Sequence, residues 1–239
     1  MKRIGPLSLA AVVAAFLLSG GLAQERAAAA AEQACPPYAQ AVKVRFKKLT
    51  PDPTYNHRLN VAGIRNLFLT RGQSISGAHE RALGVTYSEI VFFLEGNTKI
   101  VPRGRGYCVY LETVGAEFGW RKMEIHIANE YRRGTCEYNA VLDHENQHVS
   151  IIRKALSGYA PRVRAELERE LSRQRPIYTR NPQTAADRAM EDLYGRMRGV
   201  VDRFQRSQSS RHGAIDSSRN YGAIADLCPN WDQNLAASR

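Results

Sequence analysis

The chain has 239 residues, of which 44% are hydrophobic and 24% charged, and its formal net charge at pH 7 is +11. This length and apolar content suffice for one domain with a substantial core. No segment beyond the first residues is apolar over the 18 or so positions that a membrane-spanning helix needs, so an integral membrane bundle is excluded.

The N-terminus has the order of a secretory signal peptide. Met1-Lys2-Arg3 precedes an apolar run from Leu7 to Leu18, and small residues follow up to Ala23. We expect a signal peptide over residues 1–23, a flexible leader over residues 24–34 and one mature domain over residues 35–239. Ala27 to Ala31 offer a second cleavage site. The mature protein is therefore expected to be periplasmic or secreted.

Export also limits the partners. Removal of Lys2 and Arg3 with the signal peptide lowers the formal charge from +11 to +9. An exported protein seldom meets nucleic acid, so we expect no nucleic-acid partner. We assign the positive charge first to solubility. The charge is also compatible with peripheral contact with an anionic envelope surface. We expect a monomer.

Four cysteines in an exported chain predict two disulfides. Three connectivities are possible, and the sequence does not choose among them. A pairing of Cys108 with Cys136 and of Cys35 with Cys228 would connect a strand to the following helix and tie the ends of the domain together.

The first half of the mature chain predicts strands. Apolar and basic residues alternate from Val42 to Lys47, and a helix is expected over Asn60 to Thr70 before a Gly/Ser loop around Gly72 to Gly77. Further strands are predicted by β-branched and aromatic runs at Val85 to Leu94, Tyr107 to Leu111 and Met123 to Ile127.

The second half predicts helices. One begins before His144, a second is expected over Pro161 to Gln174, and a long third begins at Asn181-Pro182, an N-cap with proline at the first helical position. Apolar residues at three- and four-residue spacing in the third helix predict packing on the first. These residues are Ala186, Ala189, Met190, Leu193, Met197, Val200, Val201 and Phe204.

The first of these helices contains the pattern His144-Glu145-Asn146-Gln147-His148. Residues four apart lie on the same helix face, so His144 and His148 can bind one metal ion. Glu145 would lie beside the metal, where a carboxylate can take a proton from water. The pattern therefore predicts Zn²⁺ and hydrolysis.

The phase of this helix supports that interpretation. Its apolar arc contains Glu145, and an ionised carboxylate without a partner is costly to bury. The alternative is a surface helix whose histidines and Glu145 merely border the core.

A catalytic zinc site normally has three protein ligands, so one ligand remains to be found. Glu168 has a spacing from the pattern that glutamate ligands use, but Glu166 and Glu170 are better oriented on a helical wheel. The other histidines are His57, His79, His126 and His212. His212 is followed by Gly213, which would allow the backbone to turn the imidazole toward the core.

On these residues the chain resembles the bacterial family of predicted secreted zinc-dependent proteases, within the zincin-like metallopeptidases. The family has a β-rich N-terminal part, the His-Glu-x-x-His helix, a long helix and a Thr-x-His-Gly segment. Ser210-Arg211-His212-Gly213 matches that last segment. The resemblance implies His144, His148 and His212 as the zinc ligands. Ser207 stands where the family has an Asp, and Asp216 could supply that orienting carboxylate.

The resemblance also implies an α+β, zincin-like fold: a mixed or antiparallel N-terminal sheet, the active-site helix and a C-terminal helical part. In zincins an edge strand lies along the cleft above the metal helix, and residues 121–130 occupy the matching place in chain order.

We therefore expect an exported zinc metallopeptidase with Glu145 as general base and a peptide, protein or peptidoglycan-peptide substrate. Tyr131, Tyr138 and Tyr221 are candidate oxyanion donors, and none is assigned. The alternatives are a peptidoglycan-directed amidase or endopeptidase and a non-catalytic, zinc-stabilised envelope protein.

Overall fold

The structure is a computed structural model that describes residues 34–70 and 82–231. The predicted signal peptide, most of the predicted leader and the loop containing Gly72 to Gly77 and His79 lie outside the described residues. No helix in the described ranges has the length and hydrophobicity that a membrane crossing requires.

Every strand of the sheet pairs with β4 (Gly106–Ile127). β3 (Gly84–Arg103) is antiparallel to β4 from the hairpin turn to the far end, where Gly84 lies opposite Ile127. The other edge of β4 is shared by three short strands, of which one is antiparallel and two are parallel to it. These are β5 (Ile177–Thr179), β1 (Lys43–Leu49) and β2 (Thr54–Asn56). The predicted mixed sheet is confirmed.

The predicted position of the edge strand is wrong. Residues 121–127 belong to β4, which pairs with β2 on one side and β3 on the other, so this segment is central. The strand with an open edge beside the helices is β3, which pairs only with β4 among the described strands. Chain order could not reveal which strand of the hairpin is central, because that depends on β1 and β2 pairing with β4 and not with β3.

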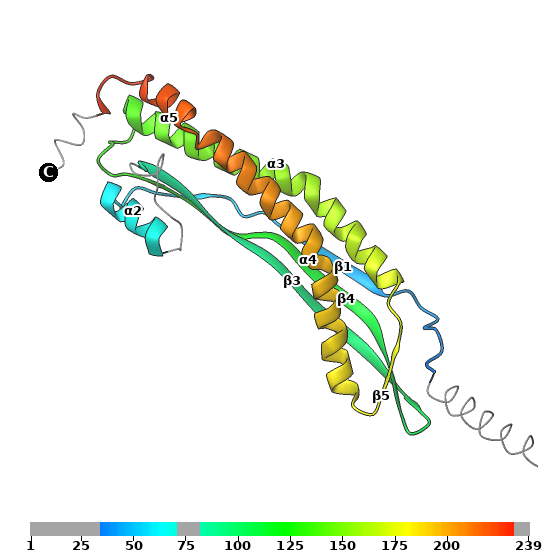
Figure 1. Cartoon of the computed structure of the whole chain (residues 1–239). Coiled ribbons are helices and arrows are strands. Elements are labelled where there is room, and N and C mark those ends of the chain that lie inside the picture. The colour runs from blue at the N-terminus through cyan, green and yellow to red at the C-terminus, as the bar shows by residue number, and fades with distance from the viewer. Residues whose placement is uncertain (1–33, 71–81, 232–239) are drawn as a thin grey trace, which may run out of the picture.

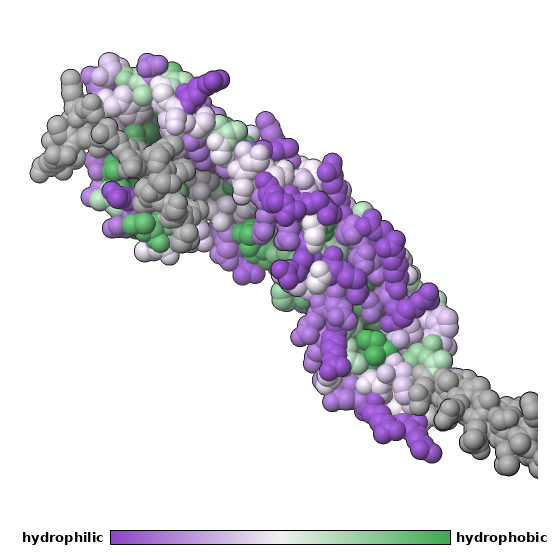
Figure 2. Space-filling view, in the orientation of Figure 1, coloured by the Kyte–Doolittle hydropathy of each residue, from purple (hydrophilic) through white to green (hydrophobic). Residues whose placement is uncertain are grey.

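Two long helices cover one face of the sheet, and the molecule is elongated and curved (Figure 1). They are α3 (Cys136–Ser172) and α4 (Pro182–Ile215). The short helices α2 (Val61–Thr70) and α5 (Ser218–Ala225) lie at one end, and the β3–β4 hairpin turn lies at the other. Hydrophilic side chains dominate the outer surface of the long helices (Figure 2).

The helix starts follow from capping. The Thr135 hydroxyl accepts the backbone N–H of Tyr138 at the start of α3, and the Asn181 side chain accepts that of Thr184 at the start of α4. The predicted Asn181-Pro182 start is thereby confirmed.

The predicted separate helix at Pro161 is wrong, because α3 continues through this proline. Ala160 and Val163 on either side of it are buried in the core, so packing outweighs the lost backbone hydrogen bond.

The main core lies between β4 and the two long helices. Phe204 of α4 is fully buried, and its ring contacts those of Phe118, Trp120 and Tyr159 at centroid distances of 5.0–5.2 Å. The predicted apolar stripe of α4 supplies this contact surface. Its buried members are Ala189, Leu193, Met197, Val200, Val201 and Phe204.

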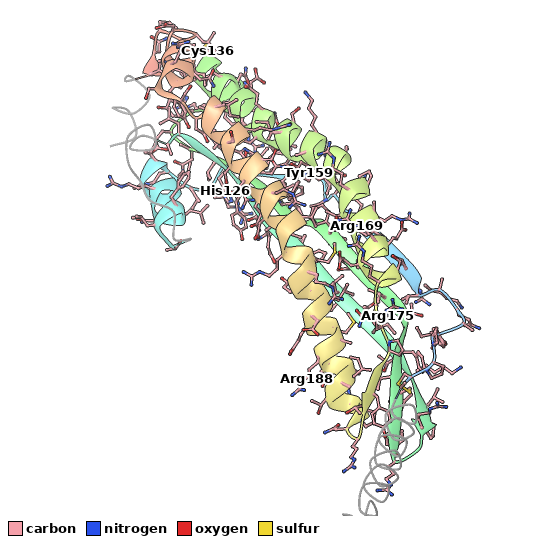
Figure 3. All side chains as sticks on the ribbon, turned by 45° about the vertical axis from the view of Figure 1, so that its right-hand side comes forward. His126, Cys136, Tyr159, Arg169, Arg175 and Arg188 are labelled. Carbon is pink, nitrogen blue, oxygen red and sulfur yellow. A yellow bond between two sulfur atoms is a disulfide. The ribbon has the colours of Figure 1, made fainter. Side chains whose placement is uncertain are left out.

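The disulfides are Cys35–Cys108 and Cys136–Cys228, so the suggested pairing of Cys108 with Cys136 is wrong. Cys108 lies near the hairpin turn and Cys136 at the start of α3, which are opposite ends of the elongated molecule. Figure 3 shows Cys136 at one end and Arg175 near the other. Two disulfides fit an oxidising compartment outside the cytosol.

Gly119 is a point where the sheet requires glycine. Its φ is +141°, and a Cβ atom there would lie 2.1 Å from the backbone oxygen of Leu49 on β1. We predict that Gly119→Ala lowers the free energy of unfolding by about 2–4 kcal/mol, because the clash is with backbone. Denaturant unfolding measures the change.

The matched control is Gly158→Ala on α3, where a Cβ would meet no atom within 4 Å. This variant should be stabilised by up to about 1 kcal/mol, since alanine is the better helix former. Equal stabilities for the two variants would contradict the account of Gly119.

Candidate metal centre

The His-Glu-x-x-His pattern lies on the first part of α3, as predicted, with its side chains turned toward the interior. The exposed fractions of His144, Glu145 and His148 are 4%, 4% and 9%. The residues that anchor this face in the core include Val141, Val149 and Ile152. The alternative of a surface helix whose histidines and Glu145 merely border the core does not hold, because all three side chains are buried.

Asp216, at the C-terminal cap of α4, completes a compact group of donor atoms. Its Oδ1 lies 3.2 Å from His144 Nε2 and 3.1 Å from His148 Nε2. One ligand atom from each of these three residues lies within 4.8 Å of the others. The structure thus brings together two imidazoles and a carboxylate, which could hold a metal ion.

The donor spacing fits a small cation. Zinc ligands lie about 2.0–2.1 Å from the metal, so two corners of a tetrahedral site are about 3.3 Å apart. The distances from Asp216 Oδ1 to the two Nε2 atoms are close to that separation. Both histidines offer the same ring nitrogen, as expected for residues four apart on one helix. The donors present therefore fit a divalent metal ion.

His212, the third ligand suggested by the resemblance, lies beside this group in a different arrangement. Its Nδ1 is 2.7 Å from His148 Nδ1, and the two rings are stacked. The contact is with the ring nitrogen of His148 that faces away from Asp216. His212 thus lies beside the candidate ligand His148, and the compact donor group contains Asp216 and not His212.

The glutamates considered as ligands lie far from the site. Because α3 is continuous, Glu170 is about 33 Å along the helix axis from His148. Its carboxylate pairs with Arg196 and Arg173, while Glu166 pairs with Arg169. His57 is also occupied elsewhere, with Nε2 2.8 Å from the backbone oxygen of Tyr131.

Glu145 is held beside the donor group by Thr86 of β3. The Thr86 hydroxyl lies 2.7 Å from Glu145 Oε2 and 3.1 Å from the backbone oxygen of the same residue. Gly84, also on β3, leaves space for this carboxylate, since a Cβ there would lie 2.7 Å from Glu145 Oε1. Glu145 is therefore fixed by the edge strand and is separate from the three donors.

Tyr221 of α5 contacts the opposite side of the group. Its hydroxyl donates to Asp216 Oδ1 at 3.1 Å, and its ring lies 5.2 Å from that of His144. Tyr221, Glu145 and His148 line a cleft of about 540 Å³. The wall opposite the helices is formed by β3 residues 84–88.

The electrostatics follow from this packing. Burial raises the pKa of Glu145, and it lowers the pKa of His212 to about 4, assisted by the positive charge of His148. Burial opposes ionisation of Asp216, but hydrogen bonds to His144 and His148 outweigh it and hold the pKa of that carboxyl below its usual range. Burial also opposes the charged form of His148, whose pKa is nevertheless raised by Asp216 and Glu145. A neutral His212 can accept the Nδ1 proton of His148.

Comparison of the chain with protein-family models, curated proteins and solved structures found no match.

Sequence reasoning found His144, Glu145 and His148 but missed two contributors. The sequence suggests Asp216 only as an orienting residue, and it gives no indication of Thr86. A signal for Asp216 was present: it lies one helical turn after His212, so the two share a face of α4. Thr86 carried no signal, because its role depends on the docking of β3 against α3.

We predict that Asp216→Ala abolishes stoichiometric binding of a divalent metal, because only two of the three donors, the imidazoles of His144 and His148, remain. His212→Ala should still bind one metal ion, with affinity about 10–100-fold weaker through loss of the His148 partner. Titration with Zn²⁺ against a competing chelator measures both. Glu170→Ala, far along α3, is the control and should bind as the wild type does. Full loss of metal in His212→Ala together with retention in Asp216→Ala would reverse the assignment.

The Cys136–Cys228 disulfide joins the start of α3 to the segment after α5, and thus closes the part of the chain that carries Asp216 and Tyr221. We predict that Cys136→Ser/Cys228→Ser lowers the free energy of unfolding by about 2–4 kcal/mol and weakens metal binding by about tenfold or more.

The control is Cys35→Ser/Cys108→Ser, which removes the disulfide at the hairpin end. It should lower stability while the folded protein keeps its metal affinity. The same loss of affinity in both pairs would show that the effect is not local to the site.

Proposed function

We propose that the protein is an exported zinc-dependent metallopeptidase with a zincin-like active site. The observation that carries this proposal is a buried carboxylate, Glu145, held beside three metal donors without being one of them. A structural zinc site normally closes with four protein ligands. Three donors, His144, His148 and Asp216, leave a position for water or substrate.

Zinc is the metal that this donor set favours, since two imidazoles and a carboxylate are ligands typical of catalytic zinc sites. When bound, zinc lowers the pKa of water and polarises a carbonyl group. Exported location and the two disulfides are compatible with such a site.

Glu145 acts as the general base. Its raised pKa, caused first by burial, makes it a stronger base than a solvated glutamate. Thr86 restrains one carboxylate oxygen, so the other is free to accept the proton of the attacking water. The same carboxylic acid then donates that proton to the leaving amine.

The other residues position these groups. His212 accepts the outer proton of His148 and thereby keeps Nε2 of that ring as the metal ligand. The Tyr221 hydroxyl, next to Asp216 and facing the cleft, can turn to donate to the substrate oxygen as charge develops on it.

The open edge of β3 supports a peptide as the substrate. Residues 84–88 form one wall of the cleft, and an extended peptide can pair with an open strand edge through its backbone. Such pairing would bring the scissile bond past Glu145. The position that zincins give to an edge strand is thus proposed for β3.

We predict that Glu145→Gln still binds one metal ion but loses hydrolysis by about 10²–10⁴-fold, because the amide cannot accept the water proton. The assay uses zinc-loaded protein with casein and with muropeptides, and metal content is measured on the same samples.

The matched control is Asp143→Asn, an exposed acid on the same helix that should keep full activity. A metal-loaded Glu145→Gln variant with unchanged hydrolysis would exclude Glu145 as the base. Wild-type protein that binds zinc but hydrolyses neither substrate would favour a non-catalytic role for the metal.

A further inference from the structure

The end of the molecule farthest from the metal centre has a surface that the proposed enzyme activity does not use. The hairpin tip, defined as residues 99–107, joins β3 to β4 and projects beyond the ends of the long helices (Figure 1). Here α3 ends at Ser172 and α4 begins at Pro182, and only the short β5 lies between them. The sheet therefore continues where its helical cover stops.

Apolar side chains are left uncovered by this arrangement. Ile100 and Tyr107 lie on the same face as buried Val109, because paired and alternate residues share a face. That face packs against the helices farther along β4. At the tip, however, the exposed fractions of Ile100 and Tyr107 are 42% and 38%, and Val101 on the other face is 37% exposed.

The same end is strongly cationic. Residues 96–109 and 173–186 contain no Asp or Glu, and they carry six basic residues. These are Lys99, Arg103, Arg105, Arg173, Arg175 and Arg180. Arg173 pairs with Glu170, whereas Arg103 and Arg105 at the turn are exposed and form no ion pair within the described residues. Figure 2 shows hydrophobic surface beside hydrophilic surface at this end.

We propose that the hairpin tip docks the protein on the surface of an anionic lipid bilayer. Such a surface has two layers that the tip matches. Its cations suit the phosphate headgroups, and its exposed aliphatic and aromatic side chains suit the boundary with the acyl chains. Tyrosine suits that boundary because its ring is apolar and its hydroxyl polar. Cys35, near the start of the described residues, is also held at this end by its disulfide with Cys108.

Docking in this way would set the distance of the candidate metal centre from the membrane surface. Thr86, which holds Glu145, lies about 55 Å along β3 from Arg103 at the turn. The proposed active site would then face material at a distance from the membrane, with the cleft at the free end of the molecule.

Binding to vesicles tests the proposal, and it is independent of hydrolysis. Protein exported from a bacterial host, with its N-terminus determined so that the signal peptide is known to be absent, is sedimented with vesicles. One set is phosphatidylcholine alone, and the other contains equal parts of phosphatidylcholine and phosphatidylglycerol. We expect binding to the second set and little to the first.

Arg103→Ala/Arg105→Ala should weaken partition onto the anionic vesicles by about 30-fold, as expected for two cations near the surface. Ile100→Ser/Tyr107→Ser should weaken it while leaving the net charge unchanged. The matched control is Arg198→Ala/Arg206→Ala, which removes two exposed cations of α4 and should bind nearly as the wild type does.

Equal losses in the two arginine pairs would assign binding to net charge and overturn the proposal. Absence of binding to anionic vesicles would also overturn it, and so would concentration-dependent dimerisation through the tip that blocks vesicle binding. Tryptic maps and unfolding curves of each variant show that the fold is retained. A protein that docks without hydrolysing any substrate would leave this inference standing and count only against the proposed enzyme.

Discussion

The packing of α4 on α3 is the contact on which the candidate metal centre depends. His144 and His148 come from one helix, whereas His212 and Asp216 come from the end of the other, more than 60 residues later in the chain. Their relative position is set by the apolar stripe of α4, with Phe204 fixed between Phe118 and Trp120 of β4. A helix with this stripe can settle in few registers, and the observed register brings its last turn to the two histidines. The chemistry of the site is therefore a consequence of core packing at a distance from it.

The sheet contributes the second half of the arrangement. β4 is paired on both edges along much of its length, so it forms a rigid centre, and among the described strands β3 keeps one edge unpaired. Thr86 on that strand bonds both the carboxylate and the backbone of Glu145. One threonine thus ties the sheet edge to the metal helix and also restrains the group proposed to move the proton.

Some of this organisation could be predicted from the sequence, and the reasons are physical. The His-Glu-x-x-His pattern, the start of α4 at Asn181-Pro182 and the apolar stripe of α4 are local in sequence, so periodicity and capping indicate them directly. The third donor, the role of Thr86 and the disulfide pairing depend on which ends of long elements meet. His212 and Asp216 are one turn apart on the same helix face, and only the depth of α4 against α3 decides which of them reaches the Nε2 atoms. The resemblance favoured His212, whereas the geometry places Asp216 there.

The location of Asp216 is itself an argument for a bound cation. It caps the C-terminal end of α4, where the helix dipole and unpaired carbonyl groups already concentrate negative potential. A partly buried carboxylate at that end is unfavourable unless positive charge is close. In the structure, the imidazoles of His144 and His148 supply hydrogen bonds, and Tyr221 donates a third. His148 also faces buried Glu145, and the two acids together raise the pKa of His148 against the effect of its burial. A divalent cation among the three donors would place positive charge beside the same two acids. Asp216 also directly precedes Ser217, the N-cap of α5, where the positive end of a helix favours a carboxylate, and a cation among the three donors would favour it further.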